Sequence, residues 1–260
     1  MIEFPDINPV AVQIGPIAIY WYGIAYVVGI LLGLSYAKQL SKKYSLDLTA
    51  KLLDDYLIYL IIGVILGGRI GYILMYDPIR YFANPLEMLQ IRSGGMSFHG
   101  GVLGVAALSY VFCNRNNIKF LALTDVISIV APIAIFFGRI ANFINGELYG
   151  RVTSEPWGVL FPNEIHARHP SQIYEAFLEG MILLIIMYST TKKIRQIGYN
   201  TGILLIFYHV FRIFCELFRE PDIQLGFIIS KVSMGQLLSI PFLILGLYFI
   251  NRSQCQLNQK

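Results

Sequence analysis

Residues 138–150 combine an arginine, two asparagines and a glutamate with the end of a strongly apolar run. A charged side chain at membrane depth costs about 3 kcal/mol on insertion scales unless it faces protein or water. The guanidinium of Arg139 is a fork of donors that fits phosphate oxygens, and the amides of Asn142 and Asn145 can orient that fork or hold a substrate hydroxyl. We therefore expect a phosphate-binding arginine, with Glu147 neutralising it or holding it in place. The alternative is a structural ion pair that closes the helix end.

A second polar face is predicted around Arg212. Tyr208, Arg212 and Glu216 are spaced by four residues, so they share one helical face, and Arg219 lies one turn further. An exposed Arg–Glu pair at this spacing stabilises a helix by only about 0.3–0.5 kcal/mol, which does not offset the burial of charge in lipid. We expect this face to line a cavity, where Arg212 converges with Arg139 on one phosphate.

Two further residues stand in glycine-rich surroundings. His99 lies between glycine pairs in residues 94–101, where backbone or substrate can approach closely, and histidine can accept a proton near neutral pH. A hydrogen-bonded structural histidine is the competing interpretation. Arg69, in residues 67–72, either packs with a satisfied charge among small residues or contacts substrate, and both roles stay open.

These residues must be positioned by membrane-spanning helices. The chain has 260 residues and only 14% charged residues, against about 25% in a typical soluble domain. Seven segments approach the roughly 20 apolar residues that cross a bilayer. They are Ile19–Ala37, Leu53–Met75, Met96–Phe112, Phe120–Ala141, Ser171–Ser189, Thr201–Phe218 and Val232–Ile250. The predicted fold is an all-α polytopic membrane protein with about seven transmembrane helices, in which residues 1–260 form one integral membrane domain.

The distribution of lysine and arginine predicts the orientation. With the N-terminus outside, eleven of the 20 basic residues fall in the inner loops and terminus, six fall in the outer loops and three lie within spans. Cytoplasmic loops carry the excess of positive charge. We expect the N-terminus and residues 142–170 outside and the C-terminus in the cytoplasm. The first basic residue is Lys38, so no positively charged leader of a cleavable signal peptide is expected.

Other kinds of chemistry find little support in the sequence. Three well-separated cysteines and four scattered histidines make no metal-binding motif, and no nucleotide loop is present. We expect no metal, no cofactor and no nucleic-acid partner.

Residues 138–150 match the pattern G-R-x-x-N-F-x-N-x-E-x-x-G, which resembles the signature of prolipoprotein diacylglyceryl transferases. The resemblance extends over nearly the whole chain. It includes residues 21–23, 67–72, 95–101, 168–175, 211–222 and 233–236. The segment between Pro162 and His169 is shorter than in some members of that family.

This resemblance implies an enzyme of the bacterial inner (plasma) membrane with seven spans. It implies transfer of the diacylglyceryl group from phosphatidylglycerol to the lipobox cysteine of a prolipoprotein signal peptide, with release of glycerol 1-phosphate. The implied partners are phosphatidylglycerol, the prolipoprotein and the lipid bilayer. The important positions of the family fall on Tyr22, His99, Arg139, Asn142, Asn145, Glu147, Gly150, Tyr208, Arg212, Glu216 and Arg219.

The residues agree with such a reaction. A thiolate attacks a glycerol carbon and a phosphate monoester departs with added negative charge, which Arg139 and Arg212 would stabilise. A free thiol has a pKa of roughly 8.5, so its thiolate must be favoured by a base or by a positive field. His99 is the candidate base, and the field of the arginines is the rival explanation.

Two other classes compete with an enzyme. A transporter also uses intramembrane arginines, but it commonly shows inverted repeats, and none is visible in this sequence. A lipid-binding scaffold has no need for three arginines within spans beside a histidine.

The predicted orientation can be tested by cysteine labelling in intact cells. A cysteine placed at Glu155 on a cysteine-free background is expected to react with an impermeant reagent, because residues 142–170 are predicted to lie outside. Labelling only after membrane disruption would show that the orientation is reversed.

Overall fold

The computed structural model spans residues 1–260 and describes residues 1–5, 7–76, 78–90, 95–220, 227–229 and 232–258. Within these ranges the side chains of residues 17, 76, 98, 99, 227–229, 232 and 256–258 lie outside the description. The described residues divide into two compact units, Met1–Leu40 with Thr124–Lys260, and Ser41–Leu123. The single domain expected over residues 1–260 stays a prediction.

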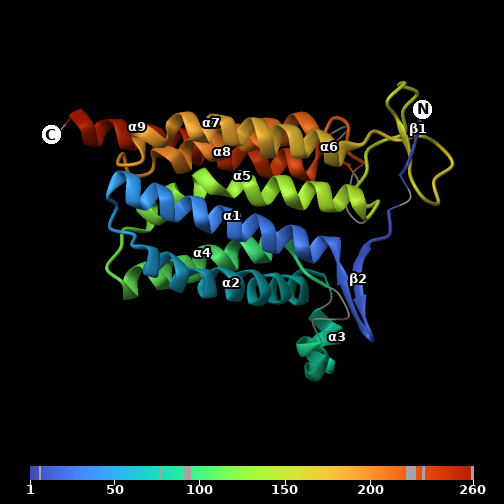
Figure 1. The fold of residues 1–260 in the computed structure, drawn as a ribbon, viewed down its shortest axis with the longest axis horizontal. Coiled ribbons are helices and arrows are strands. Elements are labelled where there is room, and N and C mark those ends of the chain that lie inside the picture. The colour runs from blue at the N-terminus through green and yellow to red at the C-terminus, as the bar shows by residue number, and fades with distance from the viewer. Residues whose placement is uncertain (6, 77, 91–94, 221–226, 230–231, 259–260) are drawn as a thin grey trace. The chain divides into compact units, whose positions relative to one another are not determined.

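Helices dominate the fold (Figure 1). In chain order they are α1 (Trp21–Tyr44), α2 (Ala50–Tyr76), α3 (Pro78–Ala83), η1 (Pro85–Leu89), α4 (Phe98–Arg115), α5 (Phe120–Ile144), α6 (Ser171–Glu175), η3 (Ala176–Ile182), α7 (Leu183–Thr190), η4 (Thr191–Lys193), α8 (Tyr199–Cys215) and α9 (Met234–Asn258).

Each of the seven predicted segments overlaps a helix, and five stretches are long and apolar enough to cross a membrane. These five are Trp21–Tyr44, Ala50–Met75, Phe120–Ile144, Ser171–Lys193 and Met234–Cys255. The chain is therefore a multi-pass membrane protein. The two remaining helices, α4 and α8, have 18 and 17 residues.

Local hydrogen bonds explain where α4 and α8 begin. The helix α4 starts at Phe98 rather than Met96, because the hydroxyl of Ser97 accepts the Gly100 N–H and caps the first turn. The helix α8 starts at Tyr199 rather than Thr201, because the carboxylate of Asp125 accepts the N–H groups of Gly198 and Thr201 at 2.6 and 2.8 Å. Asp125 thus has a structural role: it satisfies free donors at a helix start.

Short strands qualify the all-α prediction. The strand β1 (Ile2–Glu3) pairs in parallel with β4 (Val159–Leu160), β2 (Val10–Ile14) forms a hairpin with β3 (Ile17–Tyr20), and β5 (Phe227–Ile229) pairs with β6 (Val232–Ser233). Hydropathy does not reveal these pairs, which give main-chain groups outside the long helices their hydrogen-bond partners.

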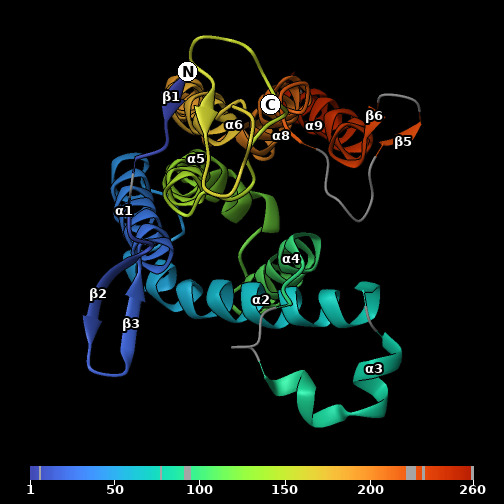
Figure 2. The ribbon, with the colours of Figure 1, turned by 90° about the vertical axis from the view of Figure 1, so that its right-hand side faces the viewer.

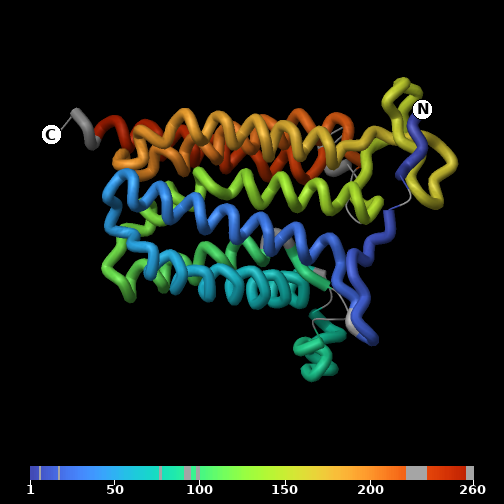
Figure 3. Tube along the Cα trace, in the orientation of Figure 1, coloured from blue at the N-terminus to red at the C-terminus, as the bar shows by residue number. Residues whose placement is uncertain are grey.

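The larger unit contains the helices α5 to α9. Figure 3 follows α6, η3 and α7 as one continuous rod, in which η3 is a π-helical stretch. The helices α8 and α9 lie side by side (Figure 2), and Gly202 meets Gly246 where they touch. The rod also packs against α8.

The smaller unit is built on close contact between α2 and α4. Gly63, Gly67 and Gly71 on α2 face Gly100 and Gly104 on α4, and Cβ atoms added at these positions would lie 2.3–2.9 Å from backbone atoms of the other helix. Small residues at helix contacts let backbones approach within a membrane. This packing fixes the start of α4, where His99 lies.

Gly104→Ala is expected to destabilise the protein, because the new Cβ would lie 2.3 Å from the Gly63 carbonyl oxygen. Overpacking of this kind costs about 1–3 kcal/mol. Gly101→Ala is the matched control on the same helix, because its nearest neighbour, the Val64 carbonyl oxygen, would be 3.8 Å away. Thermal unfolding in detergent should show a lower Tm for Gly104→Ala alone. Equal shifts for both variants would contradict the tight glycine contact.

Candidate functional site

A buried ion-pair network joins α5 to the α6–η3 rod. Arg139 on α5 contacts the carboxylates of Glu175 and Glu179, each at 3.1 Å. Neither glutamate has any solvent exposure. Burying a carboxylate is costly unless opposite charge and hydrogen bonds compensate for the lost water, so both glutamates require cations nearby.

The same carboxylates bind arginines from α8 and the turn after it. Arg212 contacts Glu175 at 2.7 Å, Glu179 at 3.7 Å and Glu216 at 2.6 Å. Arg219 reaches Glu175 at 3.4 Å. Arg139 and Arg212 therefore converge, but on shared carboxylates: Glu175 is the group on which three arginines meet, and their joint binding of one phosphate stays a prediction.

We call Arg139, Arg212, Arg219, Glu175, Glu179 and Glu216 the arginine–glutamate cluster. Its formal charges cancel. The side chains of Arg139 and Arg212 keep 17% and 15% of their surface exposed, whereas Glu175 and Glu179 keep none. The two carboxylates are thus enclosed, while the arginine side chains that neutralise them keep a small part of their surface exposed.

Sequence reasoning gave no role to Glu175 or Glu179. The available signal was a pair of carboxylates four residues apart in the otherwise apolar segment 171–189. Such a pair within a span requires cations, and Arg139 and Arg212 were the candidates. Glu179 lies within the π-helical η3, and π-turns inside helices are frequent at functional sites.

The expected partnership of Arg139 with Glu147 was wrong. Glu147 Oε1 instead accepts the amides of Asn142 at 2.8 Å and Asn145 at 3.4 Å. The reason is local: Arg139 lies on α5 facing two closer carboxylates, whereas the chain turns after Ile144 and brings Glu147 back to the last turn of the helix. The N–H of Glu147 bonds to the Asn142 carbonyl at 3.0 Å, which fixes that turn.

Gly150 packs closely against the chain at the end of α8, and thereby holds the end of the signature, residues 138–150, next to that helix. Its N–H donates to the His169 carbonyl at 2.8 Å, and an added Cβ would lie 2.4 Å from the Phe218 carbonyl oxygen. Next to it, the Arg151 guanidinium donates to the carbonyls of Glu216 and Arg219 at 3.1 and 2.9 Å. Only a residue without a side chain permits this approach, so Gly150 positions the end of α8.

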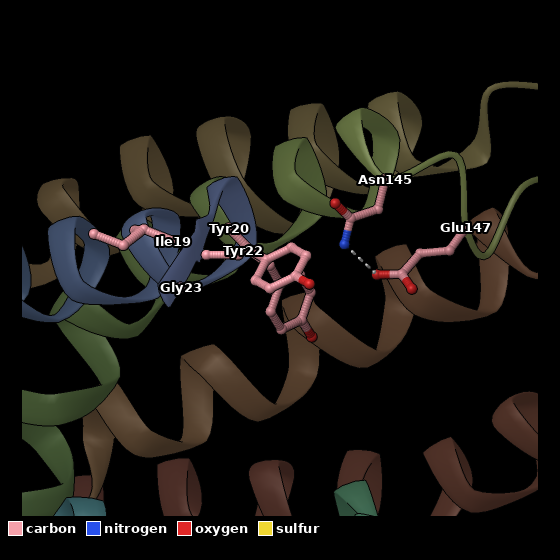
Figure 4. A pocket seen from close by; sticks show the side chains of 7 residues that line it. Ile19, Tyr20, Tyr22, Gly23, Asn145 and Glu147 are labelled. Carbon is pink, nitrogen blue, oxygen red and sulfur yellow. Dashed lines mark hydrogen bonds between the residues drawn. The ribbon is translucent and has the colours of Figure 1, made fainter. Parts of the chain in front are cut away.

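Tyr22 lines a cavity beside the signature loop. The cavity has a volume of about 600 Å³ and is lined by Ala18, Ile19, Tyr20, Tyr22, Gly23, Asn145 and Glu147. Figure 4 shows residues 19–23 on one side and the Asn145–Glu147 pair on the other. Asn145 Oδ1 is buried and has no hydrogen-bond partner among the described residues. It is an acceptor available for a hydroxyl donor, although the cavity lining includes no member of the arginine–glutamate cluster.

On α8, one contact predicted from helical spacing is present, and the cavity that this helical face was expected to line stays a prediction. Arg212 and Glu216 form the i, i+4 pair, and the Ser233 hydroxyl donates to the second oxygen of Glu216 at 2.6 Å. Tyr208 lies one turn before Arg212 on the same helix.

We call residues 151–168, which are predicted to lie outside, the outer loop, and one carboxylate binds two of the groups around it. Glu164 accepts the Tyr149 hydroxyl at 2.5 Å and the Arg168 guanidinium at 2.6 Å. These two donors hold the pKa of the Glu164 carboxyl below its usual range, with the Tyr149 hydrogen bond as the larger cause.

Arg69 and His99 belong to the smaller unit. Arg69 is buried and donates to the main-chain carbonyls of Glu87, Met88 and Gly95 at 2.6, 2.9 and 3.2 Å. These bonds favour the structural role that the sequence left open. His99 is the second residue of α4, and its side chain lies outside the described residues, so its role as a base stays a prediction.

The family model of prolipoprotein diacylglyceryl transferases matches residues 9–252 of this chain. The chain belongs to this family. Curated members include the phosphatidylglycerol–prolipoprotein diacylglyceryl transferases of Rickettsia bellii (strain OSU 85-389), 52% identical over 97% of this chain and 98% of the relative, and of Rickettsia felis, 53% identical over 99% of both chains. The protein with the same name from Rickettsia typhi is 52% identical over 98% of this chain and 99% of its own length.

Glu175→Gln is expected to lower stability strongly, because it removes the charge shared by three arginines. Removing one partner of a buried ion pair typically costs about 3–5 kcal/mol. The matched control is Glu155→Gln, which neutralises an exposed carboxylate of the outer loop. Thermal unfolding of both variants in the same detergent measures the difference. A Tm for Glu175→Gln no lower than that of Glu155→Gln would contradict the network.

Proposed function

We propose that this chain transfers the diacylglyceryl group of phosphatidylglycerol to the thiol of the lipobox cysteine in a prolipoprotein signal peptide. Glycerol 1-phosphate is the product released. The observation that carries the proposal is the match, over nearly full length, to relatives whose name states both substrates. A cluster of arginines that converge on buried carboxylates within a multi-pass membrane protein supports it.

In the proposed reaction the cysteine sulfur forms a bond to the glycerol carbon that carries the phosphate ester. The carbon–oxygen bond breaks, its electron pair stays on the phosphate oxygen, and a phosphate monoester leaves with one more negative charge. Arg139 and Arg212 stabilise this charge with guanidiniums already fixed by Glu175 and Glu179, so little reorganisation is needed as the charge develops. The arginines stabilise the transition state more than the ground state, and this difference in stabilisation accelerates the reaction.

The proton of the thiol leaves before or during attack. His99 is our candidate acceptor, and the positive edge of Arg139 and Arg212 is the alternative source of thiolate stabilisation. The remaining proposed substrate-binding positions surround phosphatidylglycerol or hold the loops that do so. They are Tyr22, Asn142, Asn145, Glu147, Gly150, Tyr208, Glu216, Arg219 and Arg69.

The proposal includes the placement in the cell. Seven spans, an outer N-terminus and a cytoplasmic C-terminus would put the signature loop on the outer side of the bacterial inner membrane, where exported prolipoproteins emerge. The basic residues of the inner loops support this orientation.

Purified protein incubated with phosphatidylglycerol and a lipobox peptide tests the reaction. The peptide mass should increase by one diacylglyceryl group, and a peptide with serine in place of cysteine should remain unmodified. Hydrolysis of phosphatidylglycerol without peptide modification would favour a lipase and overturn the proposal.

Arg139→Lys is expected to lose most activity although it keeps the charge. A lysine ammonium cannot contact two carboxylates and present a planar fork to phosphate, and losing one such electrostatic contact typically costs about 10²–10³-fold in turnover. Arg252→Lys, at an exposed position on α9, is the matched control. The peptide assay measures both variants at equal folded protein. Near-normal turnover of Arg139→Lys would show that Arg139 supplies only charge or structure.

A further inference from the structure

The segment that follows α2 exposes four large apolar side chains. Ile79 and Phe82 on α3 are 85% and 65% exposed, and Leu86 and Leu89 on η1 are 79% and 78% exposed. We call these four residues the apolar row. A patch of exposed apolar side chains marks a binding surface, because contact between these side chains and water is unfavourable.

Two carbonyls and two charged side chains of this segment have partners within the protein. The carbonyls of Glu87 and Met88 accept hydrogen bonds from the buried Arg69, and the side chain of Glu87 pairs with Arg80 at 2.8 Å. Tyr81 is buried, and its ring packs 5.0 Å from the Arg69 guanidinium. Two main-chain acceptors are thus satisfied by the buried Arg69, and the charges of Arg80 and Glu87 neutralise each other at the surface, while four large apolar side chains have no such partner.

The apolar row follows directly on a membrane-spanning helix whose last turns are also exposed and apolar. Ile70, Leu74 and Met75 at the end of this membrane-spanning helix are themselves exposed. Only residue 77 separates α2 from α3. A segment this close to the end of a span lies near the boundary between acyl chains and headgroups, because the helix reaches the edge of the hydrocarbon core there.

We propose that residues 78–89 form an interfacial anchor, in which the apolar row inserts into the bilayer at the level where headgroups meet acyl chains. The occupant of this surface is lipid rather than protein. Short amphipathic segments bind this region by burying their apolar side and keeping polar groups in the headgroup layer. Arg80, which is exposed on the same segment, provides a cation for lipid phosphate or for Glu87.

Arg69 links the anchor to the start of α4. The same guanidinium that holds the carbonyls of Glu87 and Met88 also donates to the Gly95 carbonyl at 3.2 Å, two residues before the cap of α4. The membrane contact and the turn that leads to His99 are therefore fixed to one side chain. The proposal itself is independent of the reaction, since it concerns only what covers the apolar row.

Spin labels in a reconstituted bilayer test the anchor. Single cysteines replace Phe82 and Leu86 in full-length protein from which Cys113, Cys215 and Cys255 have been removed. Accessibility to oxygen, which partitions into lipid, is compared with accessibility to a water-soluble nickel chelate. Leu74→Cys on α2 is the lipid-facing reference, and Glu155→Cys in the outer loop is the reference for water. Labels at both anchor positions are expected to show an oxygen-to-nickel ratio several-fold above that of Glu155→Cys.

Two results would overturn the anchor. A ratio equal to that of Glu155→Cys would place the apolar row in water. Low accessibility to both reagents, with dipolar broadening between labels, would show that a second copy of the chain covers it. An unchanged Tm identifies folded labelled protein, and Leu89→Cys replaces any variant that fails this check, because Leu89 is equally exposed.

Discussion

A carboxylate without solvent exposure must be neutralised by its neighbours, and Glu175 is neutralised by arginines from two separate parts of the chain. Arg139 comes from α5, while Arg212 and Arg219 come from α8 and the turn after it. The network therefore fixes both parts against the α6–η3 rod. It also keeps the guanidiniums in place before any substrate arrives, which is the condition for electrostatic catalysis without reorganisation.

The smaller unit is held together by a different constraint. Its two long helices meet through glycines, where shape rather than charge determines the distance between backbones. The buried Arg69 then binds carbonyls of the chain between these helices. In the larger unit arginine pairs with carboxylates, whereas Arg69 is buried and donates to main-chain acceptors.

The sequence predicted the helices and the meeting of Arg139 with Arg212, because apolar length and four-residue spacing are local signals. It did not predict the partner of Glu147 or the role of Glu175. Which carboxylate meets which arginine depends on how α5, α8 and the π-helical η3 are rotated, and spacing within one helix carries no information about that. The short strands were missed because two- to five-residue pairings leave no periodicity. The preference for a phosphate-binding role of Arg139 over a purely structural ion pair rests on the chemistry of the proposed reaction.

Hydrogen bonds beside Gly150 allow the outer loop to change its length without altering the geometry of the site. Mutual hydrogen bonds between residues 150–153 and residues 167–169 close this loop at its base, and Val159 pairs with Arg168 beside them. Residues beyond that base can be added or removed at small entropic cost, because closure entropy grows slowly with loop length. The shorter segment before His169 is thus compatible with an unaltered signature turn. During divergence this loop can change its length while the residues at its base remain constrained.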